Sequence, residues 1–309
     1  MTVGEGQTML PFEDRARQDV EADYAKELAE SRELLQLALC MIGSDGQGGL
    51  KVPSVPISGV TDRTRSLALG LYAKSCKQFR GISILGERGF GGEVTVLTRA
   101  LFETTLALNF IMNETVALLR GRKAFDPDPS RPLTTDFRAL LYGARAAFVE
   151  EKRHKQWSER PELLSSMHLR GDQQTIAAQT TGARRAVGEK WWGALKGGQA
   201  GLSVRDLADS LGVLSYYLVI YGDQSEVAHA GDGFMHFDLD DDGGWLDLAP
   251  SPAGIGDLLR LAGLVFLGCL TGIHNRLNFG PEAESALNAF AERFNVPDAN
   301  SKQPAPTFR

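Results

Sequence analysis

The sequence predicts a mainly α protein, a multi-helix bundle with one short β-hairpin inserted near residues 234–248. Apolar residues recur at helical spacing, in segments of helical length, along most of the 309 residues. Alternation of apolar and polar residues, which is typical of a strand, appears only in "MHFDLDDDGGWLDLA", on both sides of an acidic Gly turn. With 43% hydrophobic and 23% charged residues, the composition is ordinary for a soluble globular protein.

Helical patterns follow one another along the chain and are separated by segments rich in Gly, Pro and Ser. They are expected at about residues 12–42, 61–84, 93–120, 134–159, 204–230, 254–277 and 281–294, with a less regular helical region before residue 196. Ser203 is expected to cap the helix that starts near residue 204. The expected organisation is an N-terminal helix at 1–43, a linker at 44–60, a main helical domain at 61–295 and a disordered tail at 296–309.

The helix at 134–159 is polar and carries a basic ridge of Arg138, Arg145 and Lys152 at seven-residue spacing. A ridge of this kind is most often a solvated face. The net charge of −6 disfavours broad electrostatic capture of nucleic acid and leaves only local basic patches as candidates. If RNA is a partner, this ridge is the first place where it is expected to bind.

The cellular compartment is predicted from cysteine usage and from hydropathy. Cys40, Cys76 and Cys269 are odd in number and set in apolar helical contexts, so they are expected to be reduced core thiols. The N-terminus shows no signal peptide. The most apolar stretch, residues 261–273, is shorter than the roughly 20 residues that span a bilayer and is expected to be a buried core helix. We therefore expect a cytoplasmic protein that does not enter a membrane.

A line of polar groups occurs in "YYLVIYGDQSEVAHAG", where Tyr217, Tyr221, Ser225 and His229 fall at successive four-residue steps. Residues four apart on a helix lie on neighbouring turns of the same side. The four side chains are therefore expected to form a polar strip along a helix that is otherwise largely apolar. Either the tyrosines bury their rings and hydrogen-bond locally, or the strip lines a site.

A charged pair, Arg99 and Glu103, lies one turn apart within the apolar "VLTRALFETTLALNFI". Such a pair is expected to be buried, and buried charges need partners. A guanidinium has five donors, so Glu103 alone leaves several free, and Ser225 and His229 could complete the network. One hypothesis is a structural clasp between two core helices. The other is a pocket with Arg99 binding an anion, His229 as acid or base and Glu103 orienting it.

The segments "LTRALFETTLALNFI" and "WWGALKGGQAGLSVRDLADSLGVLSYYLVIYGDQSEVAHAG" together resemble the bacterial family catalogued as domain of unknown function 5677, over roughly residues 90–235. That family has an Arg-x-x-x-Glu helix, a Trp-containing segment and a Tyr…Ser-x-x-x-His-Ala helix, and it has no agreed activity. It is similar by analogy to the HEPN group of helical domains, several of which are RNases that use a paired Arg and His. Those enzymes carry both residues on one helix, whereas here Arg99 would come from another.

Two further patterns have alternative interpretations. Residues 202–217 could begin a DNA-binding helix-turn-helix, but the second helix lacks basic residues and is too apolar for that role. The hairpin residues Asp238, Asp240, Asp242 and Gly243 match half of a calcium loop, but Ala249 stands where the bidentate Glu is required. We therefore expect no metal, and no cofactor motif is present.

Two functional hypotheses follow from these patterns. The first is a non-catalytic module that binds a protein partner or a small anionic ligand. The alternative is a HEPN-like, metal-independent RNase of a toxin or defence system. A homodimer is also expected, because Gly263, Gly268 and Gly272 would let another helix approach closely.

Overall fold

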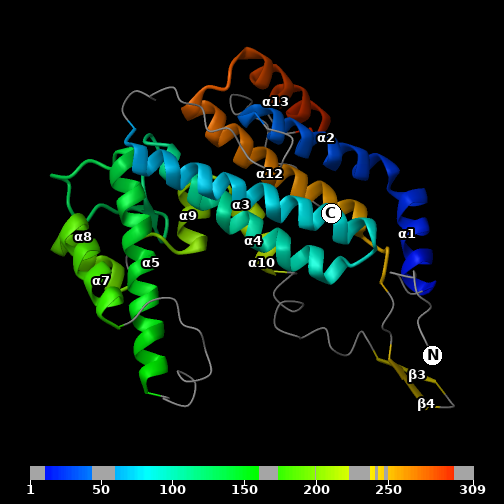
Figure 1. Cartoon of the computed structure of the whole chain (residues 1–309), viewed down its shortest axis with the longest axis horizontal. Helices are drawn as coiled ribbons and strands as arrows, with labels where there is room; N and C mark the ends of the chain where they lie inside the picture. The colour runs from blue at the N-terminus through cyan, green and yellow to red at the C-terminus, as the bar shows by residue number, and fades with distance from the viewer. Residues whose placement is uncertain are drawn as a thin grey trace. The chain divides into compact units, whose positions relative to one another are not determined.

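The structure is a computed structural model that describes residues 11–43, 60–159, 173–198, 200–222, 237–240, 243–246 and 250–295 (Figure 1). Helices make up most of these residues, which confirms the mainly α class. Contacts between Cα atoms divide the chain into two compact units. The first unit contains Met1–Val55, Tyr72–Thr105 and Leu218–Arg309, and the second contains Pro56–Leu71 and Leu106–Tyr217.

The helices are α1 (Pro11–Asp23), α2 (Ala25–Ile42), α3 (Asp62–Glu87), α4 (Gly91–Met112), α5 (Thr135–Ser158), α7 (Gln173–Val187), α8 (Glu189–Lys196), α9 (Val204–Ser210), α10 (Leu214–Gly222), α12 (Ile255–Leu277) and α13 (Pro281–Arg293). Two antiparallel strand pairs accompany them, β1 (Leu119–Arg120) with β2 (Lys123–Ala124) and β3 (Phe237–Asp240) with β4 (Gly243–Leu246). The second pair lies within the predicted hairpin. The predicted linker (apart from Val60) and tail lie outside the described residues, so the predicted domain limits stay predictions.

Two of the predicted helices differ from the sequence patterns, because one is interrupted and the other ends early. The first is interrupted at Tyr24, where the backbone leaves the helical region at φ −127° and ψ 28°. The ring of Tyr24 packs closely on Gly256. A Cβ atom added to Gly256 would lie 2.6 Å from this ring. The third was expected to continue to Arg120, but α4 ends at Met112 and the chain then forms β1 and β2.

The helix expected at 204–230 is divided by a turn. The N-cap at Ser203 is confirmed, since its hydroxyl accepts a hydrogen bond from the Asp206 amide at 3.1 Å. Gly212 then adopts φ +73°, and the Val213 amide donates to the Ala208 carbonyl at 2.8 Å. This is the helix-ending geometry that glycine favours, and α10 begins directly after it.

The core of the first unit joins helices that are distant in sequence. The rings of Phe79 on α3 and Phe266 on α12 stack with their centroids 4.4 Å apart. A Cβ atom at Gly263 would lie 2.9 Å from the ring of Phe294, which follows α13. Small residues on α12 therefore allow elements of the same chain to pack closely.

Two of the glycines that motivated the predicted homodimer have neighbours within the chain. Gly263 faces Phe294, and a Cβ atom at Gly268 would lie 4.0 Å from Thr105 on α4. The homodimer therefore stays a prediction. If it forms, light scattering at micromolar concentration should give about twice the monomer mass of 33.6 kDa, and the monomer mass would rule it out.

Two described helices, α4 and α12, are long and apolar enough to cross a membrane by length and composition alone. The apolar stretch at 261–273 is part of the 23-residue α12, so the expectation that it is too short for a span was wrong. The most apolar 18-residue window of α4 is 67% buried inside the protein, and that of α12 is 56% buried. A buried core helix passes the same test, so this finding does not decide the location.

The three cysteines are free, and two of them occupy the core of the first unit. Cys76 is 7% exposed and Cys269 is fully buried, whereas Cys40 is exposed. The prediction of a core thiol was therefore wrong for Cys40. It lies on the outward face of α2 one turn after exposed Gln36, whose amide contacts its sulfur at 3.4 Å.

The buried thiols predict a loss of stability at alkaline pH. Burial raises the pKa of Cys76 and of Cys269 to about 12 from a reference of 9.0. Because the pKa of each buried thiol is higher in the folded than in the unfolded protein, the two thiols contribute their full stabilisation below pH 9. This contribution to the free energy of unfolding is lost as the pH rises towards 12. We expect the free energy of unfolding of Cys76→Ala to fall less steeply over this range than that of wild type. Cys40→Ala is the control, and equal slopes for the two variants in urea titrations would contradict the prediction.

The second unit contains a buried cation where the sequence suggested a solvated ridge. Arg138 on α5 is 1% exposed, so the prediction for this residue was wrong. Its guanidinium donates to the carbonyls of Phe110, Glu114, Val116 and Leu133. Two of these carbonyls belong to residues just beyond the end of α4, where backbone acceptors lack helical partners. Arg138 therefore holds the C-terminal end of α4 against the start of α5.

Candidate functional site

The candidate site in the first unit is formed by Arg99 and Glu103 on α4 and Tyr221 on α10. The guanidinium carbon of Arg99 lies 4.0 Å from the ring centroid of Tyr221. Arg99 Nε is 3.6 Å from Glu103 Oε1, and the Tyr221 hydroxyl donates a hydrogen bond to the same oxygen. The ring of Tyr221 thus attracts the cation while its hydroxyl contacts the carboxylate.

The local sequence explains why these groups meet. Arg99 and Glu103 are four residues apart, so they lie on adjacent turns of α4, and an ion pair at this spacing is favourable. Tyr221 occurs in the last turn of α10, a helix whose mean hydropathy is high and whose Ile220 is fully buried. Burial of Ile220 fixes the side of α10 that faces the core and thereby places Tyr221 beside α4.

The environment keeps Tyr221 protonated. Burial raises the pKa of its hydroxyl, and the hydrogen bond to Glu103 raises it further, whereas Arg99 acts in the opposite direction. A phenol whose pKa lies above its ordinary value remains a hydrogen-bond donor at neutral pH. In this arrangement Tyr221 can donate to a carboxylate but cannot act as a general base near pH 7.

The ion pair is more exposed than the sequence suggested. The Arg99 side chain is 26% exposed and that of Glu103 is 45% exposed, so the expectation of a buried pair was wrong. The reason is that one stripe of α4 faces outward. Val96, one turn before Arg99, lies on this stripe and is itself 45% exposed. The pair therefore keeps part of its hydration, and its electrostatic contribution to stability is modest.

The other predicted site residues are only partly placed. Ser225 and His229 lie outside the described residues, so their meeting with Arg99 and Glu103 stays a prediction. Tyr217, predicted as a binding residue, lies one turn before Tyr221 on α10 and is half-buried. Asp242 of the acidic hairpin also lies outside the described residues, and the expectation that the hairpin needs no calcium stays a prediction.

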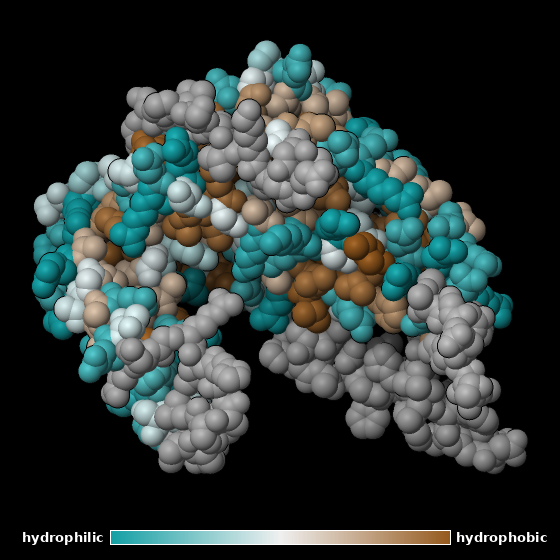
Figure 2. All heavy atoms as spheres, in the orientation of Figure 1, coloured by the Kyte–Doolittle hydropathy of each residue, from teal (hydrophilic) through white to brown (hydrophobic). Residues whose placement is uncertain are grey.

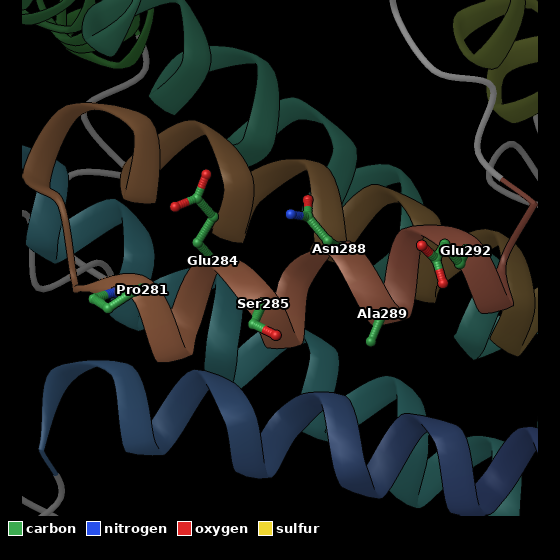
Figure 3. A pocket seen from close by; sticks show the side chains of 6 residues that line it. All are labelled: Pro281, Glu284, Ser285, Asn288, Ala289 and Glu292. Carbon is green, nitrogen blue, oxygen red and sulfur yellow. The ribbon is translucent and has the colours of Figure 1, made fainter.

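A surface depression of about 420 Å³ occurs on α13, a place that the sequence did not single out. It is lined by residues at helical spacing, namely Pro281, Glu284, Ser285, Asn288, Ala289 and Glu292. Figure 3 shows that all six come from one helix, with Glu284 and Asn288 on one side of α13 and Ser285 and Ala289 on the other. These lining residues form the exposed polar face of α13, so we do not assign a function to the depression.

The family model described as "Family of unknown function (DUF5677)" matches residues 65–244, more than half of the chain. This match includes both the Arg99–Glu103 pair and the segment from Tyr217 to His229. No curated protein and no solved structure matches the chain. Because the family model spans more than half of the sequence, the chain belongs to the family of unknown function DUF5677.

Proposed function

We propose that the chain is a non-catalytic binding or interaction module in which Arg99, Glu103 and Tyr221 form a structural clasp. The observation that carries this proposal is that one oxygen of Glu103 contacts both Arg99 and the Tyr221 hydroxyl, while the Tyr221 ring contacts the guanidinium. The three groups contact one another, and the phenol is held in its protonated form. In the proposal, Ser225 and His229 extend the clasp.

We propose that the ligand of this module is a protein partner or a small anion that binds beside the clasp. Arg99 supports this because its side chain is 26% exposed and its guanidinium has more donors than Glu103 can use. An exposed carboxylate or phosphate group could therefore take the remaining donors. We place the module in the cytoplasm, as expected from its free thiols, and cell fractionation tests this location.

The alternative activity is metal-independent RNA cleavage, with Arg99 as the cation and His229 as acid or base. The two proposals are separated by Arg99→Ala and His229→Ala, each assayed for stability and for cleavage of a labelled single-stranded RNA in the presence of EDTA. A non-catalytic module predicts no cleavage by wild type and lower stability in both variants. Cleavage by wild type that both variants lose, with unchanged melting temperatures, would establish the nuclease instead.

A further inference from the structure

The outward face of α3 carries a row of cations that is separate from the clasp. Lys74, Lys77 and Arg80 follow one another at three-residue steps, and Arg88 lies in the turn after the helix. All four side chains are exposed, and none forms an ion pair with another described residue. We call these four residues the α3 cationic face.

The α3 cationic face is positive in a chain of net charge −6. From residue 63 to residue 86, α3 contains no acidic residue. Glu87, at the end of the helix, is already paired with Arg32 at 3.0 Å. The positive charge is therefore local and is not neutralised by the rest of α3.

The α3 cationic face is also rigid, because the opposite side of the helix is part of the core. Tyr72, Phe79 and Ile82 on that side are all fully buried. At a rise of about 1.5 Å per residue, the helix from Lys74 to its end spans roughly 20 Å. Figure 2 looks onto α3 and α4 and shows hydrophilic side chains beside hydrophobic ones there.

We propose that the α3 cationic face binds the sugar-phosphate backbone of a single-stranded nucleic acid. Proteins that bind single strands without reading sequence combine a positively charged groove along the backbone with aromatic side chains that stack on the bases, and the α3 cationic face offers the first of these. Lys74, Lys77 and Arg80 lie within about 9 Å of helix and Arg88 follows beyond the helix end, so the four cations are spread over about 20 Å. The guanidinium groups of Arg80 and Arg88 match phosphate oxygens geometrically. The proposal concerns a different surface from the clasp and does not rest on the proposed function.

The neighbouring surface favours a narrow polyanion over other acidic partners. Helix α4 lies directly beside α3, since a Cβ atom at Gly81 would be 3.1 Å from Leu97. Glu93 is exposed on α4 and would repel a flat anionic membrane, whereas Glu103 is already paired with Arg99. A folded protein partner would need a broad apolar centre to its interface, but among the described residues of α3 and α4 the exposed large apolar side chains are only Ile84 and Val96.

The test is the salt dependence of binding to a labelled 20-nucleotide oligouridine, measured by fluorescence anisotropy on the full chain. Four phosphate contacts predict that affinity falls about 50-fold between 50 and 200 mM salt. The quadruple variant K74Q/K77Q/R80Q/R88Q should bind at least about tenfold more weakly at 50 mM salt and lose most of the salt dependence. The double variant K74Q/K77Q should be intermediate, and circular dichroism checks that both variants fold.

The matched control is K123Q/R185Q/K196Q/R205Q, which removes the same charge from four exposed cations of the second unit that lie outside the predicted ridge on α5. This control should bind the oligouridine as wild type does. Equal weakening in both quadruple variants would show that net charge alone governs binding and would overturn the proposal. Absence of binding at 50 mM salt, or binding only to an acidic peptide or to vesicles containing phosphatidylserine, would overturn it as well.

Discussion

Replacing Arg138 by Ala is expected to lower the free energy of unfolding by about 3–5 kcal/mol. The side chain is 1% exposed and donates to four backbone carbonyls, two of them in the segment that follows α4. Burial lowers the pKa of Arg138 to about 10, so the guanidinium still carries its charge at neutral pH. Its removal leaves buried acceptors without a donor and α4 without the cation near its C-terminal end.

Two variants make this measurement specific. Arg138→Lys keeps the charge but has three donors in place of five, so it should fall between wild type and Arg138→Ala. Arg145→Ala, in the same predicted ridge but more exposed, should change stability by no more than about 0.5 kcal/mol. Urea unfolding followed by circular dichroism gives all three values. Equal midpoints for Arg138→Ala and Arg145→Ala would show that the carbonyl contacts do not stabilise the fold.

Local signals in the sequence account for what could be predicted of the fold. The start of α5 follows Thr134, whose hydroxyl accepts from the Phe137 amide at 3.2 Å, and α9 follows the Ser203 cap. The hairpin was visible as strand alternation around an Asp-Gly turn. Signals of this kind lie within a few residues of the element that they define, so no tertiary structure is needed to recognise them.

Long-range contacts account for what could not be predicted. Arg138 looked like a solvated cation because three of its four acceptors lie far from it in sequence, between residues 110 and 116. The pairing of Glu103 with Tyr221 joins residues 118 positions apart. The sequence did indicate that Arg99, Glu103 and Tyr221 are special, since each is a polar group in an apolar helix. It could not indicate that the Tyr221 ring would lie against Arg99. Neither could it indicate that Arg99 and Glu103 lie on an exposed stripe of α4.

If His229 extends the clasp, His229→Ala is expected to lower the free energy of unfolding by about 0.5–1 kcal/mol, because water can partly replace it at the partly exposed Arg99 and Glu103. Tyr221→Phe removes only the hydrogen bond to Glu103 and should cost about 1 kcal/mol, since the ring still faces Arg99. Chemical denaturation of both variants provides the values. A His229→Ala variant as stable as wild type would remove His229 from the clasp.

The double-mutant cycle between Glu103→Ala and Tyr221→Phe tests the clasp most directly, since it measures whether the Tyr221 hydroxyl and the Glu103 carboxylate interact. Residues that share one hydrogen-bond network show coupling energies of about 0.5–3 kcal/mol, whereas distant residues are additive within about 0.3–0.5 kcal/mol. The clasp predicts a coupling of at least about 1 kcal/mol in the free energy of unfolding. Additive effects of the two substitutions would contradict it.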